Sequence, residues 1–307
     1  MLLKPLHSYW GLLPVAAAFA LLLALPAAAA EGARAGLTLC AGVVVPSLLP
    51  FLILSGLAAA LGLPALVAEK LAAVWRLLRV PPVCAAPLLL GLLGGYPVGA
   101  TALAALVKSG DLSPEEAAHA LPWCSNTGPG FIVGFAGAGV FGSVRVGLIL
   151  YLCHVLAALI LAFFGGNRRA FAPVSRPFSV ESSLAEALPE AVRSAAMNMI
   201  CICAYVVFFS VLSSLLRAAG LHFSPLAAGI LELSQGVAAL RGMPASPCAA
   251  ALCAFLLGFG GLSVHCQVLY AMAGTDVKCA RHFAGRILHG LISALLAFLL
   301  FTMLPQT

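Results

Sequence analysis

Charged side chains are scarce in this sequence: Asp, Glu, Lys and Arg make up 8% of its 307 residues, whereas 63% of the residues are hydrophobic. Soluble globular domains carry about 25% charged residues, so a mean hydropathy of +1.10 excludes that class. The chain is therefore predicted to cross a membrane several times. Its net charge of +6 comes from single basic residues between apolar runs, which indicates membrane topology and not a nucleic-acid-binding surface.

The sequence also lacks the motifs of common enzyme classes. GxSxG, HExxH, Walker loops and paired carboxylates are absent, and none of the ten cysteines belongs to a CxxC pair. Cys279 and His282 have a metal-like spacing, but two ligands are too few for a site. His119 and Cys124 suggest a thiol nucleophile, yet nothing in the sequence orients a base for it. We expect no enzyme activity, no metal and no cofactor.

Apolar segments of membrane length follow one another along the chain. We expect a retained first transmembrane helix over about residues 9–30; the alternative is a cleaved secretory signal, because an alanine run follows the apolar centre. Segment 131–142 is too short to cross and is predicted to be a re-entrant arm, and 64–80 an amphipathic helix at the membrane surface. The further apolar segments are 36–62, 83–107, 144–164, 195–219, 225–240, 246–273 and 284–304.

If segment 225–240 does not cross the membrane, being a hairpin or an interfacial piece, the other segments define two sides of the membrane. The basic residues are unevenly divided between these two sides. The larger set is predicted to be cytoplasmic, together with the N-terminus and the 165–193 loop. Its eleven members are Lys4, Lys70, Arg76, Arg79, Arg168, Arg169, Arg176, Arg193, Lys278, Arg281 and Arg286. The five on the other side are Arg34, Lys108, Arg145, Arg217 and Arg241.

Two apolar segments share an interruption by paired glycines. CAAPLLLGLLGGYPVGATAL (84–103) aligns with CAAALCAFLLGFGGLSVHCQVL (248–269), and the pair Gly94-Gly95 then matches Gly260-Gly261. In the predicted topology the two segments cross in opposite directions, as the inverted repeats of secondary transporters do. Unwound backbone at membrane depth is tolerated where it lines an enclosed cavity or binds a ligand. The alternative is that the glycines only allow tight helix packing.

These patterns predict an all-α polytopic membrane protein with two inverted repeats, broken helices and re-entrant hairpins, an architecture typical of transporters. The only long polar stretch, 165–193, divides the two halves. The predicted parts are an N-terminal transmembrane helix (1–35), a first repeat (36–164), a cytoplasmic linker (165–193) and a second repeat (194–307).

Polar side chains gather at the interruptions of the first half. GGYPVGAT contains one group, and WCSNTGPG (123–130) contains another that has the composition of a hairpin tip. For Asn126 the alternative is a solvent-facing loop cap. The candidate binding residues in this half are Tyr96, Thr101, Ser125, Asn126 and Thr127. The candidate hinge and hairpin residues of the whole chain are Gly94, Gly95, Pro97, Gly128, Pro129, Gly260 and Gly261.

The second half contributes ILELSQG (230–236) and GFGGLSVHCQ (258–267). Glu232 is its only acidic residue inside an apolar segment, and an intramembrane carboxylate is a functional-site hypothesis by default. The alternative is a structural ion pair with Arg217 or Arg241. In a helix His265 points away from the face of Ser263 and Gln267, whereas in an unwound chain all three could face one cavity. The candidates here are Glu232, Gln235, Ser263, His265 and Gln267.

GGYPVGA, SNTGPGFIVG, ELSQG and GFGGLSVHCQ occur in an order that resembles the sporulation integral membrane protein family of YlbJ type, within the nucleoside-recognition or Gate domain group. The resemblance covers about residues 36–300. It implies that both repeats are Gate-like and that Asn126, Thr127, Glu232 and Gln267 hold a ligand. It also implies the cytoplasmic or forespore membrane of an endospore-forming bacterium. Gly94 and Thr101 depart from the serine and lysine that the family often has there.

The function predicted from these features is secondary-transporter-like handling of a small polar solute, nucleoside-like in kind, with a proton or sodium ion coupled at Glu232 and a link to sporulation. The first alternative is a non-transporting membrane scaffold for spore cortex or coat assembly. The second is an enzyme acting on lipid or envelope precursors. The expected partners are the lipid bilayer, the solute and its ion, with no nucleic acid. A homo-oligomer, the identity of the solute and the choice of ion stay open.

Overall fold

The computed structural model describes residues 12–165 and 183–303, and every regular element in these ranges is a helix. Five helices are long and apolar enough to cross a membrane: Pro26–Ala60, Val144–Gly165, Leu184–Ala218, Pro247–Ala271 and Ala280–Met303. This composition agrees with the all-α membrane architecture expected from the sequence. Shorter apolar helices lie among the long ones, at Leu12–Ala24, Pro82–Gly94, Val98–Lys108 and Gly130–Val140.

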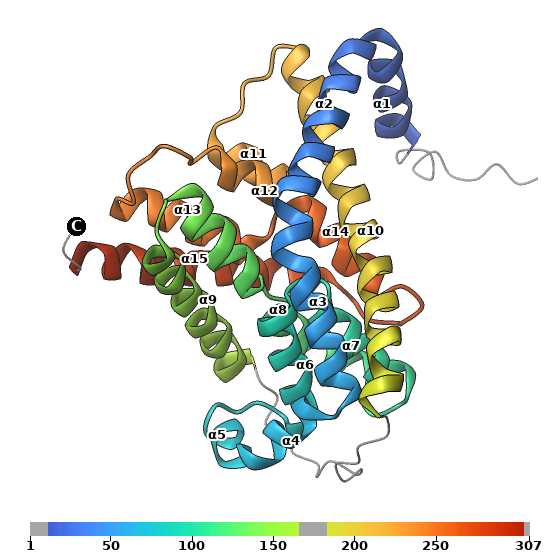
Figure 1. The fold of residues 1–307 in the computed structure, drawn as a ribbon, viewed down its shortest axis with the longest axis vertical. Helices are drawn as coiled ribbons and strands as arrows, with labels where there is room; N and C mark the ends of the chain where they lie inside the picture. Colours follow the sequence, from blue (N-terminus) through green and yellow to red (C-terminus); the bar gives the residue numbers. More distant parts are fainter. Residues whose placement is uncertain (1–11, 166–182, 304–307) are drawn as a thin grey trace, which may run out of the picture.

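Two long rods form one side of the molecule. The first consists of α2 (Pro26–Leu39), the π-helical stretch η2 (Cys40–Val44) and α3 (Val45–Ala60), and α10 (Leu184–Ala218) runs antiparallel beside it (Figure 1). Small residues permit the close approach, because a Cβ atom on Gly32 would lie 2.7 Å from Val211 Cα. This pair forms one wall of the site described below.

Two helix pairs are each interrupted once. α6 (Pro82–Gly94) and α7 (Val98–Lys108) are separated by Gly95–Pro97, and α13 (Pro247–Phe259) and α14 (Gly261–Ala271) by Gly260 alone. Gly95 has φ 76° and ψ −166°, and Gly260 has φ 94°, so both occupy conformations that glycine adopts without a Cβ penalty. The interruptions predicted from the paired glycines are therefore present. In the second pair the helix resumes at Gly261, two residues sooner than in the first.

Short helical pieces fill the space between the long helices. α8 (Pro114–Cys124) leads through the non-helical residues 125–128 into π-helical η3 (Gly130–Val140) and then α9 (Val144–Gly165). α11 (Pro225–Leu231) and α12 (Leu233–Ala238) are joined at Glu232, which agrees with the hairpin expected at 225–240. α4 (Leu63–Lys70) and α5 (Ala72–Leu77) lie where an amphipathic helix was expected, with a break at Leu71.

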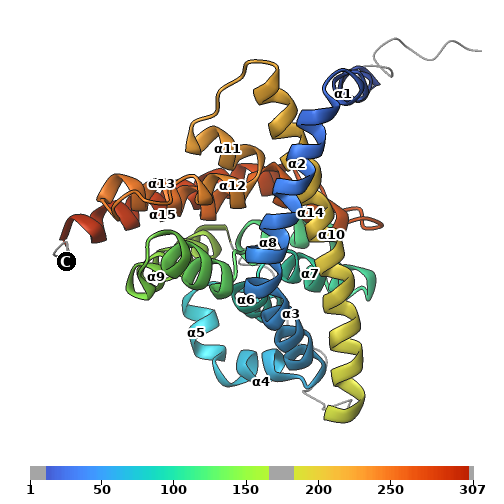
Figure 2. The same ribbon diagram turned by 45° about the horizontal axis from the view of Figure 1, so that its top comes forward.

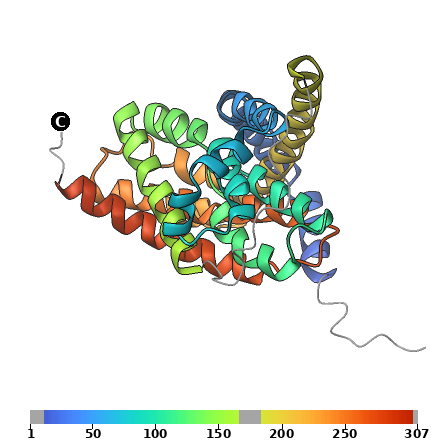
Figure 3. The same ribbon diagram turned by 90° about the horizontal axis from the view of Figure 1, so that it is seen from below.

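α13 and α15 (Ala280–Met303) lie side by side and run across the α2–α3 and α10 pair (Figure 2). α15 also packs against α8 and α9, so that it closes one side of the interior (Figure 3). The largest apolar core lies between α6, α8, α9 and α13 and includes Leu88, Leu121, Leu150 and Leu256. The interrupted helices pack into this core with one face and expose side chains such as Leu93 and Tyr270 on the other.

Two expectations about boundaries need correction. The helix expected over 9–30 ends at Ala24, because Leu25 precedes Pro26 and leaves the helical region with φ −127° and ψ 56°. The described part of this helix, α1 (Leu12–Ala24), has 13 residues. Of the expected linker 165–193, residues 166–182 lie outside the described ranges, and residues from 184 onward are helical. The Ser183–Glu186 capping box begins α10 there.

Candidate functional site

The four interruptions of helical structure meet near the centre of the fold. A Cβ atom on Gly95 would lie 2.9 Å from Gly128 N, which places the α6–α7 break against the tip between α8 and η3. A Cβ atom on Gly261 would lie 2.6 Å from Gly229 O, so the α13–α14 break lies against the α11–α12 hairpin. The two halves touch where Tyr96 Oη approaches Gly260. Breaks that are distant in sequence thus form one structural feature.

Each break leaves carbonyl groups without helical partners, and side chains satisfy several of them. Because such groups are costly to bury unpaired, these contacts make the irregular backbone tolerable. They are Tyr151 Oη to Leu92 O at 3.0 Å, Thr127 Oγ1 to Leu257 O at 2.8 Å, Asn126 Nδ2 to Trp123 O at 2.8 Å and Arg286 Nη1 to Pro122 O at 3.1 Å. The Thr127 bond joins the first half of the chain to the second.

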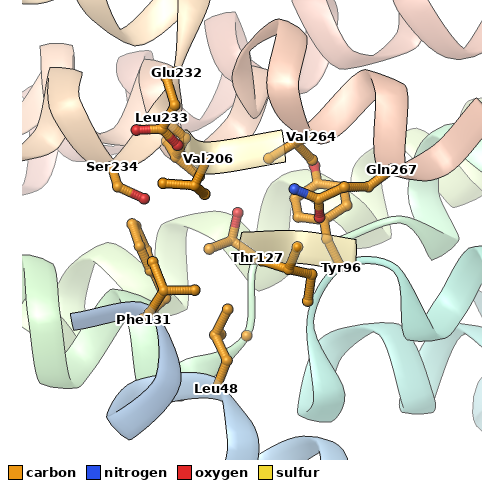
Figure 4. A pocket seen from close by; sticks show the side chains of 13 residues that line it. Leu48, Tyr96, Thr127, Phe131, Val206, Glu232, Leu233, Ser234, Val264 and Gln267 are labelled. Atoms are coloured by element: carbon orange, nitrogen blue, oxygen red, sulfur yellow. The ribbon is translucent and has the colours of Figure 1, made fainter. Parts of the chain in front are cut away.

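A cavity of about 40 Å³ lies between the breaks and the two long rods (Figure 4). Its polar lining consists of Tyr96, Thr127, Glu232, Ser234 and Gln267. Its apolar lining includes Val44, Leu48, Phe131, Ile202, Val206 and Val264. One water needs roughly 10–15 Å³ of such space, so the cavity in this conformation holds a few waters or one small ion. Organic ligands of drug size occupy sites of roughly 300–1,000 Å³.

Glu232 is the acidic group of this cavity and is 1% exposed. Its carboxylate caps α12 by accepting from Gln235 N at 2.8 Å, and Ser263 Oγ lies 3.5 Å from the other oxygen. Within the described ranges no Lys, Arg or His lies within 4.0 Å of it, and Arg217 and Arg241 are both exposed. The structural ion pair considered from the sequence is therefore not formed. An ionised carboxylate here is stabilised by hydrogen bonds alone.

Four of the ten candidate binding residues line the cavity: Tyr96, Thr127, Glu232 and Gln267. Two more lie directly behind it, where Ser263 contacts Glu232, and Gln235 Nε2 donates to Ser210 Oγ at 2.9 Å. Figure 4 shows Glu232 and Ser234 on one side of the space, with Tyr96 and Gln267 opposite. The sequence therefore located most of the polar groups that the fold brings together.

The other four candidates lie elsewhere. Ser125 and Asn126 are buried in the tip but do not line the cavity, and Asn126 is 0% exposed, which rules out a solvent-facing cap. Thr101 is exposed and bonds to Pro97 O in its own chain segment. His265 points away from the cavity, with Nδ1 3.2 Å from His282 Nε2, because α14 is helical from Gly261 onward and not unwound.

The candidate hinge residues all lie at or beside the breaks. Gly94 ends α6 and Gly95 follows it, Pro97 precedes α7, and Gly260 and Gly261 divide α13 from α14. Gly128 and Pro129 precede the π-helical η3. π-helical turns are frequent at functional sites, and η2 likewise ends at Val44 in the cavity wall.

Sequence reasoning missed a buried polar stripe on α15. His282, Arg286, His289 and Ser293 are all buried, and their spacing of four, three and four residues is that of one helical face. That spacing was readable from the sequence. Arg286, assigned above to the cytoplasmic basic set, is instead enclosed in the protein, so that set has ten members. No three His, Cys, Asp or Glu side chains in residues 12–165 and 183–303 are grouped to hold a metal.

Thr127→Val is expected to lower the free energy of unfolding by about 1–3 kcal/mol, because the buried Leu257 carbonyl loses its partner while the side-chain shape is kept. Thr101→Val is the matched control: its hydroxyl is exposed and bonds only to the carbonyl four residues earlier. Chemical unfolding of the detergent-solubilised protein measures both. Equal losses in the two variants would contradict the link across the halves.

Five helices long and apolar enough to cross a membrane, with helix breaks that meet at a small cavity bordered by polar groups, define a multi-pass integral membrane protein. Among curated proteins, the chain is 29% identical over 318 aligned residues to the sporulation integral membrane protein YlbJ of Bacillus subtilis. The alignment covers 90% of this chain and 78% of that protein, and the chain is its homologue. No family model and no solved structure matches the chain.

Proposed function

We propose that this protein binds a small polar solute at the meeting point of its helix breaks and carries it across the membrane in a secondary-transporter-like cycle that serves sporulation. The observation that carries the proposal is the convergence of four breaks on one polar cavity containing an unpaired, buried carboxylate. Broken helices at the site are the common plan of secondary transporters. The sporulation link rests on the homology described above.

The two halves are proposed to be inverted repeats. The support is that each half has one interrupted helix pair whose break lies against a second break, at Gly95 and Gly128 in the first half and at Gly261 and Gly229 in the second. In this proposal the α8–η3 and α11–α12 pieces act as the gates. The nucleoside-recognition character of the family resemblance makes a nucleoside-like solute the first to test.

The volume of the cavity sets a condition on transport. A space of about 40 Å³ cannot enclose a nucleoside-sized solute, so binding requires the gates to separate from the two long rods. The same volume suits a proton carrier or a small cation beside Glu232, which is the proposed coupling group. In this conformation the cavity is too small for an organic solute, and wider forms are those that exchange solute.

The alternative function is a membrane scaffold for spore envelope assembly. One observation favours it: the enclosed cavity is too small for an organic solute, as expected if the fold carries nothing. In a scaffold, the helix breaks would serve only to pack the helices together. It therefore predicts that no solute stabilises the protein.

A thermal-shift screen of the purified protein against nucleosides, bases and small metabolites tests the proposal. A bound solute at one hundred times its dissociation constant is expected to add about 2.7 kcal/mol to the free energy of unfolding. Glu232→Gln and Gln267→Ala are expected to abolish that gain. Glu115→Gln, at an exposed residue of α8, is the control and should retain it.

The outcome distinguishes the two functions. A stabilising solute whose effect disappears in both site variants supports transport at the breaks. A solute that stabilises all variants equally binds elsewhere and overturns the site assignment. No stabilisation by any solute, with the site variants as stable as the wild type, favours the scaffold.

A further inference from the structure

Arg286 is the most deeply enclosed charge of the described residues, with an exposed fraction of 0%. It lies on α15, whose neighbours are α8, α9 and α13. An arginine keeps its proton in proteins, so burial leaves a full positive charge in the interior. Such a charge is costly unless it is paired and its donors are bonded.

One end of the guanidinium is well bonded. Nη1 donates to Pro122 O at 3.1 Å and lies 2.7 Å from His289 Nδ1, and the guanidinium carbon lies 5.4 Å from the centre of the Tyr96 ring. The remaining donors, Nε and Nη2, are buried and have no hydrogen-bond partner. These two N–H groups form one edge of the guanidinium, the parallel pair with which arginine binds a carboxylate through two hydrogen bonds.

The neighbouring histidines do not supply the missing acceptor. The Thr127 amide donates to His154 Nε2 at 3.1 Å, so that nitrogen accepts and its acceptor capacity is used. His289 accepts from Arg286 at Nδ1 and donates from Nε2 to His154 O at 3.1 Å, which makes it a neutral ring with both nitrogens bonded. His265 and His282 face each other at 3.2 Å. One of the two outer ring nitrogens of this pair, His265 Nε2 or His282 Nδ1, is an unpartnered acceptor, but neither accepts from Arg286. The cluster therefore holds one positive charge, and none of its ring nitrogens is bonded to the open edge.

No carboxylate balances this charge. The ion pair that the structure records within 12–165 and 183–303 is the exposed Arg193–Glu190 pair, on another helix. The carbonyl end of α8, where Pro122 O lies, contributes a partial negative charge of about half an elementary charge. That contribution faces Nη1 and leaves the Nε–Nη2 edge uncompensated.

We propose that the Nε–Nη2 edge of Arg286 is a binding site for a carboxylate-type monovalent anion. The anion is either free or the anionic group of the solute. Tyr96 links the two sites: its ring lies under the guanidinium, and its unpartnered hydroxyl borders the cavity. A displacement of Tyr96 would connect the cavity to Arg286. The proposal does not depend on transport, because a scaffold could bind the same anion.

The test measures the melting temperature of the full-length protein in detergent at constant sodium and constant ionic strength, with isethionate, which is not a carboxylate, replaced stepwise by acetate or chloride. Glycine, a zwitterion without net charge, is added to the isethionate buffer in a separate titration. Acetate is expected to raise the wild-type Tm saturably, by on the order of 5 °C at one hundred times its dissociation constant. Arg286→Lys keeps the charge but lacks the two parallel donors. The acetate concentration that gives half of the maximal Tm increase should therefore be at least tenfold higher in this variant than in the wild type. Arg281→Lys, at an exposed residue of the same helix, should match the wild type.

The responses to the different ligands show whether the site takes a free anion or the anionic group of a solute. An acetate or chloride response without a glycine response identifies a free anion, and a stronger glycine response identifies the anionic group of a solute. The absence of any saturable response in the wild type overturns the proposal, even if Arg286→Lys does not fold. Equal responses in the wild type and Arg286→Lys overturn it as well. Glu232→Gln should keep the anion response, so failure here is separable from failure of the transport proposal.

Discussion

Gly95→Ala is expected to lower the free energy of unfolding by at least about 3 kcal/mol. Gly95 has φ 76° and ψ −166°, a region that is essentially restricted to glycine and that costs other residues about 1–3 kcal/mol. The added Cβ would also lie 2.9 Å from Gly128 N and 3.2 Å from Gly128 Cα. Because those atoms are backbone, they cannot rotate away, and the tip must shift.

Gly134→Ala is the matched control for this substitution. Gly134 lies in the helical stretch η3, and a Cβ atom there would meet nothing within 4 Å. Alanine in a helix is favoured over glycine by roughly 0.5–1 kcal/mol, so this variant should be neutral or slightly more stable. Denaturant unfolding in detergent measures both. A loss in Gly95→Ala no greater than in Gly134→Ala would mean that the breaks are not locked together.

The breaks themselves could be predicted from the sequence because their cause is local. Gly94-Gly95 with Pro97 two residues on disfavours a continuous helix, and the second break rests on Gly260-Gly261 alone, while the flanking apolar runs place both breaks inside membrane-length segments. The same holds for the tip, where Asn126 and Gly128-Pro129 are turn residues by chemistry alone. Glu232 was recognisable for a related reason, since a carboxylate in an apolar run is expensive wherever the fold places it.

The walls of the cavity could not be predicted in the same way. Val44 and Val206 belong to rods whose sequences are apolar on all sides, so no pattern indicates which residue faces the site. His265 was ambiguous because its direction depends on whether the helix resumes at Gly261 or a turn later. Arg286 was assigned to the membrane surface by counting charges, and only its spacing from His282 and His289 indicated that it faces inward.

The carboxyl group of Glu232 should make the stability of the wild-type protein depend on pH. The α11–α12 hairpin lies outside the five long spans, and burial raises the pKa of Glu232 above its usual value, although hydrogen bonds from Gln235 and Ser263 oppose part of the shift. The folded state then holds this proton more tightly than the unfolded state. The stabilisation is complete below the unfolded pKa and is lost as the pH rises towards the folded pKa, by at most about 1.4 kcal/mol per pH unit.

Glu232→Gln is expected to remove this dependence while preserving the shape and the cap on α12, so in sodium-free buffer the variant should become more stable than the wild type as the pH is raised. Melting curves between acidic and alkaline pH measure the difference, with Glu115→Gln as the exposed control. Identical pH profiles of wild type and Glu232→Gln would show that ionising the buried carboxylate does not lower the free energy of unfolding. A bound cation would neutralise the ionised carboxylate of Glu232. Sodium added at alkaline pH therefore distinguishes coupling to a sodium ion from coupling to a proton. Recovery of wild-type stability identifies a sodium site, and its absence leaves the proton as the coupled ion.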